Sequence, residues 1–439
     1  MQPFSKAWWG GIATSTIVLT AIIAPRTSTF LILFVLAAAI ADHLIRPKLA
    51  RRPETFIAPF AAVFAFAIWA MASSLWSVEF WHSLLKPVFL MVVALAVWLA
   101  IRSASTATRP AVHYIGEGAL VGASIAYILV AIEILSDQLI TRSLMTVFPA
   151  LYANISKHVL VAADGTVLEI TISNLNRRMS ILIWLFWPVM LLAAYDPNRL
   201  RKFFGFAAVG FGTVVILFFG THQSSQVAIA GGLIAFLLAL LLSRHLFIKG
   251  LIVVWAAVVL LAVPIALGAF NAGLHKADWL FHSARHRVVI WGTAADEAMR
   301  SPVVGIGADA TRKAMRMATD REKQEGHRRD LGEFQSGYAN HAHNAYLQVW
   351  YELGVIGALL FLAMGVATLN AISRLKSELQ PITIAMFVTT SIMIAFSYSI
   401  WQTWFTAAFG MATALLAIGI RKRSDNLPQP DSDTNASKS

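Results

Sequence analysis

Long apolar runs separated by short polar segments are the dominant pattern of this chain. A helix needs roughly 20 apolar residues to cross the hydrocarbon part of a bilayer, and about twelve runs approach or reach that length. They lie at residues 8–25, 28–45, 56–76, 81–101, 113–135, 178–195, 203–220, 224–243, 247–270, 345–370, 381–399 and 402–420. The pattern predicts an all-α polytopic membrane protein with about twelve transmembrane helices.

Two long hydrophilic segments interrupt this series. The larger one separates the ninth run from the tenth, and it contains a helix-like stretch at residues 288–300 and a turn, Gly305-Ile306-Gly307. The end of the chain is rich in Ser, Asp, Asn and Pro without apolar periodicity, which predicts disorder. The expected organisation is helices 1–5 in residues 1–135, a loop at 136–177, helices 6–9 in 178–270, a large loop at 271–344, helices 10–12 in 345–420 and a disordered tail at 421–439.

Composition supports a membrane class. Of the 439 residues, 58% are hydrophobic and 13% are charged, whereas soluble chains carry roughly 25% charged residues. This balance excludes a water-soluble globular enzyme. The chain has no cysteine, which excludes disulfides, thiolate nucleophiles and cysteine-ligated metals. The net charge of +12 comes from basic residues clustered between apolar runs, so we expect membrane lipids and not nucleic acid as partners.

The basic residues also predict the orientation of the chain, because Lys and Arg in short loops are retained in the cytoplasm. They occupy alternate loops: Arg46, Lys48, Arg51 and Arg52; Arg102 and Arg109; Arg199, Arg201 and Lys202; Arg244 and Lys249; Arg374 and Lys376; Arg421, Lys422 and Arg423. Both termini are therefore expected in the cytoplasm of a bacterium, with both long loops in the periplasm. The first run lacks a small-residue cleavage site, so we expect it to remain as a helix of an inner-membrane protein.

The segment that closes the large loop carries the strongest candidate chemistry. His341, His343 and Asn344 stand at the mouth of the tenth run, where a histidine can act as a base near neutral pH. Asn344 could orient the imidazole or a substrate hydroxyl. Glu352 falls inside the run, where a buried carboxylate is either functional or pairs helices. On these residues alone, a histidine pair that only satisfies loop backbone groups remains an equal alternative.

The spacing of this segment resembles a known family hallmark. His343-Asn344, nine residues and then Gly354-x-x-Gly357 is similar to the motif of the O-antigen ligase and O-antigen polymerase superfamily. We expect the two glycines to allow close approach of neighbouring helices.

Further positions between about 170 and 420 extend the resemblance. Arg287 and Trp291, followed by Ser301-Pro302 and Gly305-Ile306-Gly307, are similar to the family's Arg-x-x-x-Trp segment, and Asn176-Arg177-Arg178 is similar to its Asn and Arg position. Many relatives carry an arginine before the eighth helix. This chain has Ser225 and Gln226 there instead, which would have to contact a phosphate or sugar.

The resemblance implies an enzyme that takes glycan from undecaprenyl diphosphate at the periplasmic face. The acceptor would be lipid A-core for a ligase or a growing glycan for a polymerase. The leaving diphosphate needs cations, and guanidinium groups pair bidentately with phosphate. The candidates are Arg285, Arg287, Arg177 and Arg178, with His343 or His341 as the base of an inverting transfer. The basic cluster at residues 312–329 is interpreted as a solvated helix surface without a catalytic role.

We expect no metal and no cofactor. The one Asp-x-Asp sequence, Asp431-Ser432-Asp433, falls in the predicted tail, and the histidine pairs His282/His286 and His341/His343 have no nearby carboxylate to complete a ligand set.

Two other functions remain open. An Arg, ten residues, Gly pattern found in some polymerases occurs here only from Arg199 and Arg201, on the predicted cytoplasmic side, which favours a ligase. A protein could also be the acceptor.

A secondary transporter would place polar residues near the bilayer midplane. Most runs are free of them, although Glu117 and Glu133 lie in or near the fifth.

Overall fold

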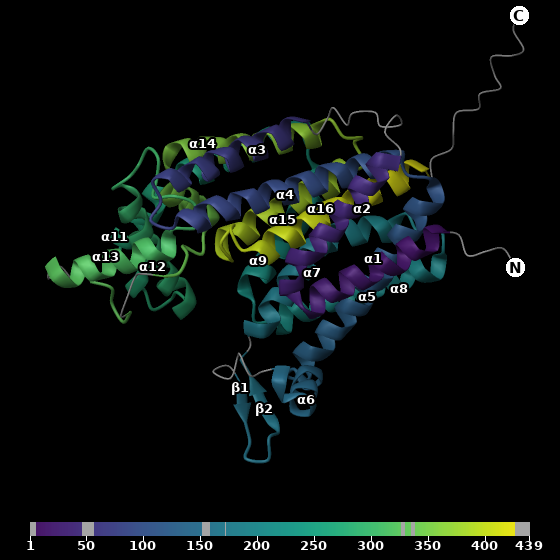
Figure 1. Ribbon diagram of the computed structural model, residues 1–439, viewed down its shortest axis with the longest axis horizontal. Coiled ribbons are helices and arrows are strands. Elements are labelled where there is room, and N and C mark those ends of the chain that lie inside the picture. Colours follow the sequence, from purple (N-terminus) through teal and green to yellow (C-terminus); the bar gives the residue numbers. More distant parts are fainter. Residues whose placement is uncertain are drawn as a thin grey trace, which may run out of the picture.

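The computed structural model describes residues 6–45, 57–151, 159–171, 173–325, 330–334 and 339–425. A bundle of long helices fills most of the molecule (Figure 1). The bundle helices are α1 (Lys6–Ile23), α2 (Ser28–Ile45), α3 (Ile57–Ala72), α4 (Phe80–Thr106), α5 (Arg109–Leu135), α7 (Ser173–Ala194), α8 (Arg199–Phe219), α9 (Gln223–Leu241), α10 (Arg244–Leu260), α11 (Ala262–Asn271), α14 (Ala345–Ser373), α15 (Gln380–Phe396) and α16 (Thr403–Asp425).

Smaller elements connect the bundle helices. They are the 3-10 turns η1 (Pro25–Thr27), η3 (Ser73–Leu75), η4 (Pro149–Leu151) and η6 (Leu274–Lys276), the helices α6 (Leu139–Val147), α12 (His282–Ala298) and α13 (Thr311–Glu325), and the strands β1 (Val159–Val161) and β2 (Val167–Ile170). The helix-like stretch predicted at residues 288–300 lies within α12 and the turn that follows it.

The structure confirms an all-α polytopic membrane protein. Among the described residues, nine helices are long and apolar enough to cross a bilayer, and α10 with α11, bent by 61°, can form a tenth span. The apolar helices at Trp8–Ile23 and Gln380–Phe396 are shorter. All twelve predicted runs coincide with these elements, but the number of spans stays a prediction. Large apolar side chains such as Phe34 (67% exposed) and Phe218 (76%) face outward, as contact with lipid requires.

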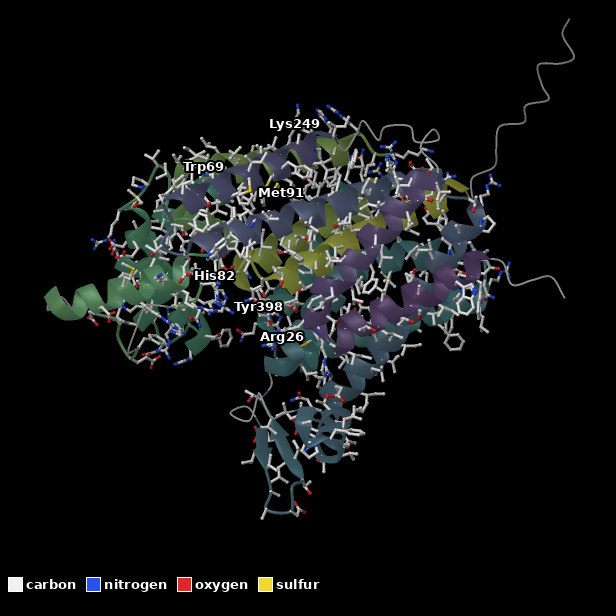
Figure 2. The ribbon with its side chains drawn as sticks, viewed as in Figure 1. Arg26, Trp69, His82, Met91, Lys249 and Tyr398 are labelled. Carbon is white, nitrogen blue, oxygen red and sulfur yellow. The ribbon has the colours of Figure 1, made fainter. Side chains whose placement is uncertain are left out.

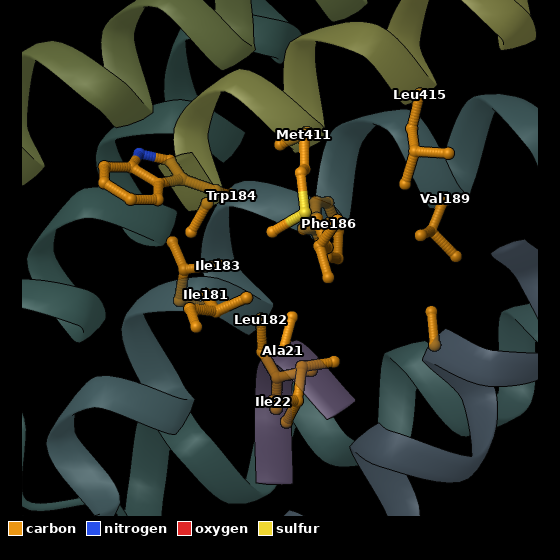
Figure 3. Packing of buried hydrophobic residues seen from close by; sticks show 14 of the residues in the cluster. Ala21, Ile22, Ile181, Leu182, Ile183, Trp184, Phe186, Val189, Met411 and Leu415 are labelled. Atoms are coloured by element: carbon orange, nitrogen blue, oxygen red, sulfur yellow. The ribbon is translucent and has the colours of Figure 1, made fainter. Parts of the chain in front are cut away.

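Helix α7 forms the centre of the bundle. Its consecutive residues Ile181, Leu182, Ile183 and Trp184 are all buried, and Figure 3 shows them between α16 and α1. A helix that is apolar on every side is stable only when other helices surround it. Burial of α7 therefore fixes the position of its N-terminal part, where Arg177 and Arg178 lie.

Basic residues at the start of α8 and the end of α16 meet at one end of the bundle. Arg201 forms ion pairs with Asp196 and Glu117, and Lys422 lies 3.0 Å from the same Asp196 carboxylate. These contacts join the α7–α8 connection, the start of α5 and the end of α16. Helices α12 and α13 lie at the opposite end (Figure 1). The arrangement agrees with the alternation of basic loops, while the side of the membrane that each end faces stays a prediction.

The segment predicted as a loop at 136–177 contains structure of its own. Helix α6 packs against the antiparallel hairpin β1–β2 through Met145, Val167 and Ile170, and this unit projects from the bundle (Figure 1). The C-terminal helix α16 continues to Asp425, beyond the boundary predicted at residue 420. The remainder of the predicted tail, with its Asp-x-Asp sequence, lies outside the described residues.

Candidate functional site

A break in α14 anchors the glycine turn of the large loop. Gly354 has φ 65° and ψ −165° inside the helix. The loop inserts there, because the amide of Gly307 donates to the carbonyl of Glu352 (2.8 Å) and the amide of Val355 donates to the carbonyl of Pro302 (2.8 Å). A Cβ on Gly354 would stand 2.2 Å from the carbonyl oxygen of Val303. We expected Gly354 to admit a neighbouring helix; instead it admits this loop.

The second motif glycine, Gly357, lies three residues after the break at Gly354. A Cβ there would lie 2.2 Å from the Cβ of Leu353, a residue of its own helix. The expected contact with a neighbouring helix is therefore absent among its nearest described neighbours.

Glu352 ties the loop to the bundle. Its carboxylate is fully buried and accepts hydrogen bonds from the Thr311 hydroxyl (2.5 Å), the Gln348 amide (3.0 Å), the Asp309 backbone amide (3.1 Å) and the Trp401 indole. These donors come from the large loop, from α14 and from the turn before α16. Glu352 therefore joins the large loop to the bundle, and the choice between a functional and a helix-pairing carboxylate stays a prediction.

The histidine turn is held in place by two further motif residues. Trp291 of α12 donates its indole N–H to the carbonyl of Ala342 (2.9 Å). The side-chain oxygen of Asn344 accepts from the amide of Leu347 (3.1 Å) and so caps the N-terminus of α14. His343 itself adopts a left-handed backbone conformation, with φ 51°. Asn344 and Trp291 therefore determine where the imidazole of His343 lies.

The tautomer of His343 follows from its one hydrogen bond. Its Nδ1 lies 3.1 Å from the carbonyl oxygen of Ser397. A carbonyl only accepts, so Nδ1 carries the hydrogen and Nε2 keeps its lone pair. Burial, assisted by the charge of Arg287, lowers the pKa of His343 against the opposing effect of the Ser397 bond. The imidazole is consequently neutral and ready to accept a proton near pH 7.

His341 packs beside this imidazole, with 4.0 Å between the two ring centroids. Burial, with smaller effects of His343 and Arg312, lowers the pKa of His341 to about 3. Its Nε2 is buried and has no hydrogen-bond partner in the described structure. His341 is thus also neutral.

A cavity of about 570 Å³ opens beside the histidine turn, between α12 and α13. The described residues that line it include no carboxylate. Its ionisable lining consists of His286, Arg287, Arg312, Arg316, His341 and His343. Such a lining favours an anion.

The four predicted arginines lie in different environments. Arg287 lines the cavity, where burial lowers its pKa. Arg285 turns away and pairs with Glu333 (3.2 Å) and Asp278 (3.7 Å). Arg178 pairs with Glu133 of α5 (3.7 Å), and Arg177 lies over the ring of Trp404, 6.0 Å from its centroid. Of these four arginines, the described lining of the cavity includes Arg287 and none of the other three.

Two cavity residues were missed by the sequence analysis. Arg312 and Arg316 of α13 line the cavity, and both residues are exposed, as expected for a solvated helix surface. Their spacing of four places both side chains on one helix face. Met315 between them is buried. An apolar residue inside a charged stretch was the available signal.

The predicted phosphate contacts of Ser225 and Gln226 have other partners. The Ser225 hydroxyl lies 2.7 Å from Nδ1 of His222, and the Gln226 amide donates to three carbonyls at the end of α8, including that of Gly220 (2.7 Å). The described lining of the cavity includes neither residue. Both stabilise the α8–α9 turn because they satisfy polar groups at the two helix ends.

The histidine pair of α12 packs on an aromatic ring. His286 stacks on Phe334 with 4.9 Å between centroids, and His282 lies 3.7 Å from Glu333. Within the described ranges, no group of three or more His, Asp or Glu side chains is arranged to hold a metal ion.

Part of the chain that contains this site is similar to a known family. Residues 206–362 match the family model described as O-antigen ligase. Three Rickettsia proteins, each named "Putative polysaccharide ligase", are similar. The one from R. conorii is 35% identical over 29% of each chain, the one from R. typhi 27% over 52% of this chain and 55% of its own, and the one from R. prowazekii 27% over 77% and 75%.

The matches to the first two relatives thus span less than two thirds of their length. No solved structure matches. The family segment runs from α8 to the middle of α14 and contains the break, the histidine turn and the cavity arginines. Through residues 206–362, this chain is similar to the O-antigen ligase family.

Proposed function

We propose that the protein is a glycosyltransferase of the ligase type. It moves glycan from undecaprenyl diphosphate to a hydroxyl of lipid A-core at the periplasmic face of the inner membrane. The observation that carries the proposal is one cavity where neutral His343 faces the same space as Arg287, Arg312 and Arg316. The family match and the ligase-named relatives support the class of reaction.

The arginines suit the leaving group. A polyprenyl diphosphate departs with at least two negative charges, and guanidinium groups pair with phosphate oxygens while keeping their own charge. Arg287, Arg312 and Arg316 surround the cavity from two helices. Because the described lining contains no carboxylate, their charges act on a bound ligand instead of on an acidic neighbour.

The neutral imidazole of His343 can act as the base for the acceptor hydroxyl. In the proposed step, Nε2 of His343 removes the proton of the acceptor hydroxyl as its oxygen forms a bond to the anomeric carbon. The bond from that carbon to the diphosphate oxygen breaks, the diphosphate leaves with the electron pair, and the anomeric configuration inverts. General-base assistance of this kind is worth roughly 100- to 10,000-fold in rate.

The arrangement of the basic residues supports a periplasmic location for the cavity. The basic loops lie at the end of the bundle away from α12 and α13, and positively charged loops are retained in the cytoplasm. A carrier lipid in the bilayer would present its diphosphate at the membrane surface near the cavity.

Reconstitution tests the proposal. Purified protein in proteoliposomes is supplied with carrier-linked glycan and lipid A-core, and the products are separated by gel electrophoresis and mass spectrometry. Glycan attached to lipid A-core supports ligation. Longer chains on the carrier would instead indicate a polymerase, and solute uptake by vesicles free of glycolipid would indicate a transporter.

A further inference from the structure

A second basic cluster lies near the cavity but outside its lining. Arg26 belongs to η1, between α1 and α2, and Arg177 lies near the start of α7. Helix α7 contacts η1. The guanidinium of Arg177 lies 6.0 Å from the centroid of the Trp404 ring, and Tyr398 packs on the same ring with 4.9 Å between centroids. Figure 2 labels Arg26 and Tyr398, which lie near each other in that view.

The charges of this pair are not matched by the surrounding structure. Neither Arg26 nor Arg177 forms an ion pair with a carboxylate among the described residues, and the buried Nε of Arg177 has no hydrogen-bond partner there. The next residue, Arg178, points elsewhere and pairs with Glu133, because successive helical side chains are rotated by roughly 100°. Two neighbouring guanidinium groups without a counterion favour binding of an external anion.

An uncharged pair of rings includes Tyr398 of this cluster. His222 stacks on Tyr398 with 5.8 Å between centroids. Burial, with a smaller effect of Arg287, lowers the pKa of His222 to about 4, so this imidazole is neutral. Burial raises the pKa of Tyr398 to about 12, so its phenol, which is hydrogen-bonded with Ser180, keeps its proton. The described lining of the cavity includes none of Arg26, Arg177 and Tyr398.

The surroundings of Arg26 indicate that the anion is carried by a lipid. Ile23 and Phe30, which flank η1 on α1 and α2, are 53% and 65% exposed. Large apolar side chains exposed in this way on a membrane protein face the acyl chains. An arginine between them meets the headgroup region, where phosphate esters are the abundant anions.

We propose that Arg26, Arg177 and Tyr398 form a second anion site, which binds a lipid-borne phosphate while the cavity at Arg287 holds the donor diphosphate. The assignment of the donor to the cavity rests on the proposed function. The lipid is either the phosphorylated acceptor glycolipid or an anionic phospholipid of the bilayer. In the first case the site would hold the acceptor next to the sugar to be transferred.

Binding measurements on the full chain in phosphatidylcholine nanodiscs test this site without any need for turnover. The probes are farnesyl diphosphate, lipid A, and lipid A from which the phosphates have been removed. The variants are Arg26→Gln, Arg177→Gln and Arg287→Gln. Arg300→Gln is the matched control, since its side chain is 53% exposed and pairs only locally with Glu297 in the ion pairs described.

We expect Arg26→Gln and Arg177→Gln to raise the Kd for lipid A at least tenfold while the Kd for farnesyl diphosphate stays within twofold. Arg287→Gln should do the reverse. Dephosphorylated lipid A should bind all variants alike. Competition by stoichiometric phosphatidylglycerol against lipid A would identify bilayer phospholipid as the occupant, and weak competition would identify the glycolipid; either result supports a second anion site.

Two results would overturn it. Wild-type affinity of both variants for lipid A would show that Arg26 and Arg177 do not bind its phosphate. A loss of farnesyl diphosphate binding as large as that of Arg287→Gln would show a single continuous site. Absence of glycan transfer by the wild-type protein would contradict the proposed function but would leave these binding results standing.

Discussion

At the scale of single residues, His343 shows what a motif can and cannot reveal. The sequence identified it as a candidate base from its position beside Asn344. The feature that decides its chemistry, the Ser397 carbonyl at Nδ1, comes from the turn between α15 and α16, 54 residues away. A contact between segments so far apart depends on helix packing, which a single sequence does not reveal.

The lowered pKa of His343 predicts the pH dependence of transfer. The proposed base is active when neutral, and burial lowers its pKa below the ordinary value of about 6.5. The rate should therefore hold as pH falls through 6.5 and decline only at lower pH. Initial rates between pH 4 and 8 in reconstituted vesicles would check this. A decline centred at or above pH 6.5 would contradict a buried neutral imidazole in this role.

The cavity arginines predict a contrast between neighbours of the same type. Arg312→Gln and Arg316→Gln should each lower kcat/KM by about 10- to 100-fold, since a hydrogen bond to a charged group contributes about 1.5–3 kcal/mol. Arg285→Gln should change it less than about threefold, because Arg285 pairs with the partly exposed Glu333. Steady-state kinetics with carrier-linked glycan would measure all three. An equal loss in the three variants would contradict the assignment.

The same arginines mark a limit of sequence reasoning. Arg287 stands in a recognisable motif with Trp291, whereas Arg312 and Arg316 stand in a charged stretch whose outer and inner faces look alike in sequence. Which face meets the cavity depends on how α13 packs through Met315. That information is tertiary.

At the scale of elements, the break in α14 explains why Gly354 and Gly305 occur together. The helix is interrupted so that the loop can donate to its carbonyls and accept from its amides. The sequence predicted the helix and the glycine turn correctly as separate features, but not their contact.

Replacement of Gly354 should destabilise the protein. Gly354→Ala places a Cβ 2.2 Å from a backbone oxygen at a φ of 65°, and strain of this kind costs about 1–3 kcal/mol. Gly250→Ala in α10 is the control, since no atom lies within 4 Å of its added Cβ. Thermal unfolding in detergent should show a lower midpoint for Gly354→Ala only. Equal midpoints would contradict the strained conformation.

The sequence predicted the long apolar helices better than the bends and the short elements. Apolar length identified every bundle helix, because the bilayer sets that length. The run at 247–270 was interpreted as one span, yet it bends by 61° between α10 and α11 near Pro264, where a proline lacks its amide donor. Helix α6 and the β1–β2 hairpin were missed, since strands of three and four residues leave little periodicity.

At the scale of the whole molecule, the helix bundle has two chemically different ends. One end holds the basic loops with Arg201 and Lys422, and the other holds α12, α13 and the cavity. The alternation of basic residues predicted which loops share an end. The convergence of Arg287, Arg312 and His343 in one cavity was not predictable, because it depends on how α12 and α13 fold over the bundle.

The absence of cysteine makes the orientation directly testable. Ser283→Cys lies at the cavity end and Ser377→Cys between α14 and α15, and both positions are exposed. A membrane-impermeant maleimide should label Ser283→Cys in cells with a permeabilised outer membrane. It should label Ser377→Cys only after the inner membrane is disrupted. The opposite pattern would place the cavity in the cytoplasm.

The most direct test of the central claim is a single-turnover measurement of glycan transfer by wild type and His343→Ala in proteoliposomes. Binding of farnesyl diphosphate, measured in parallel, controls for folding of the site. We expect unchanged binding with a transfer rate lowered roughly 100- to 10,000-fold in His343→Ala. A variant that binds the diphosphate and transfers glycan at the wild-type rate would contradict it.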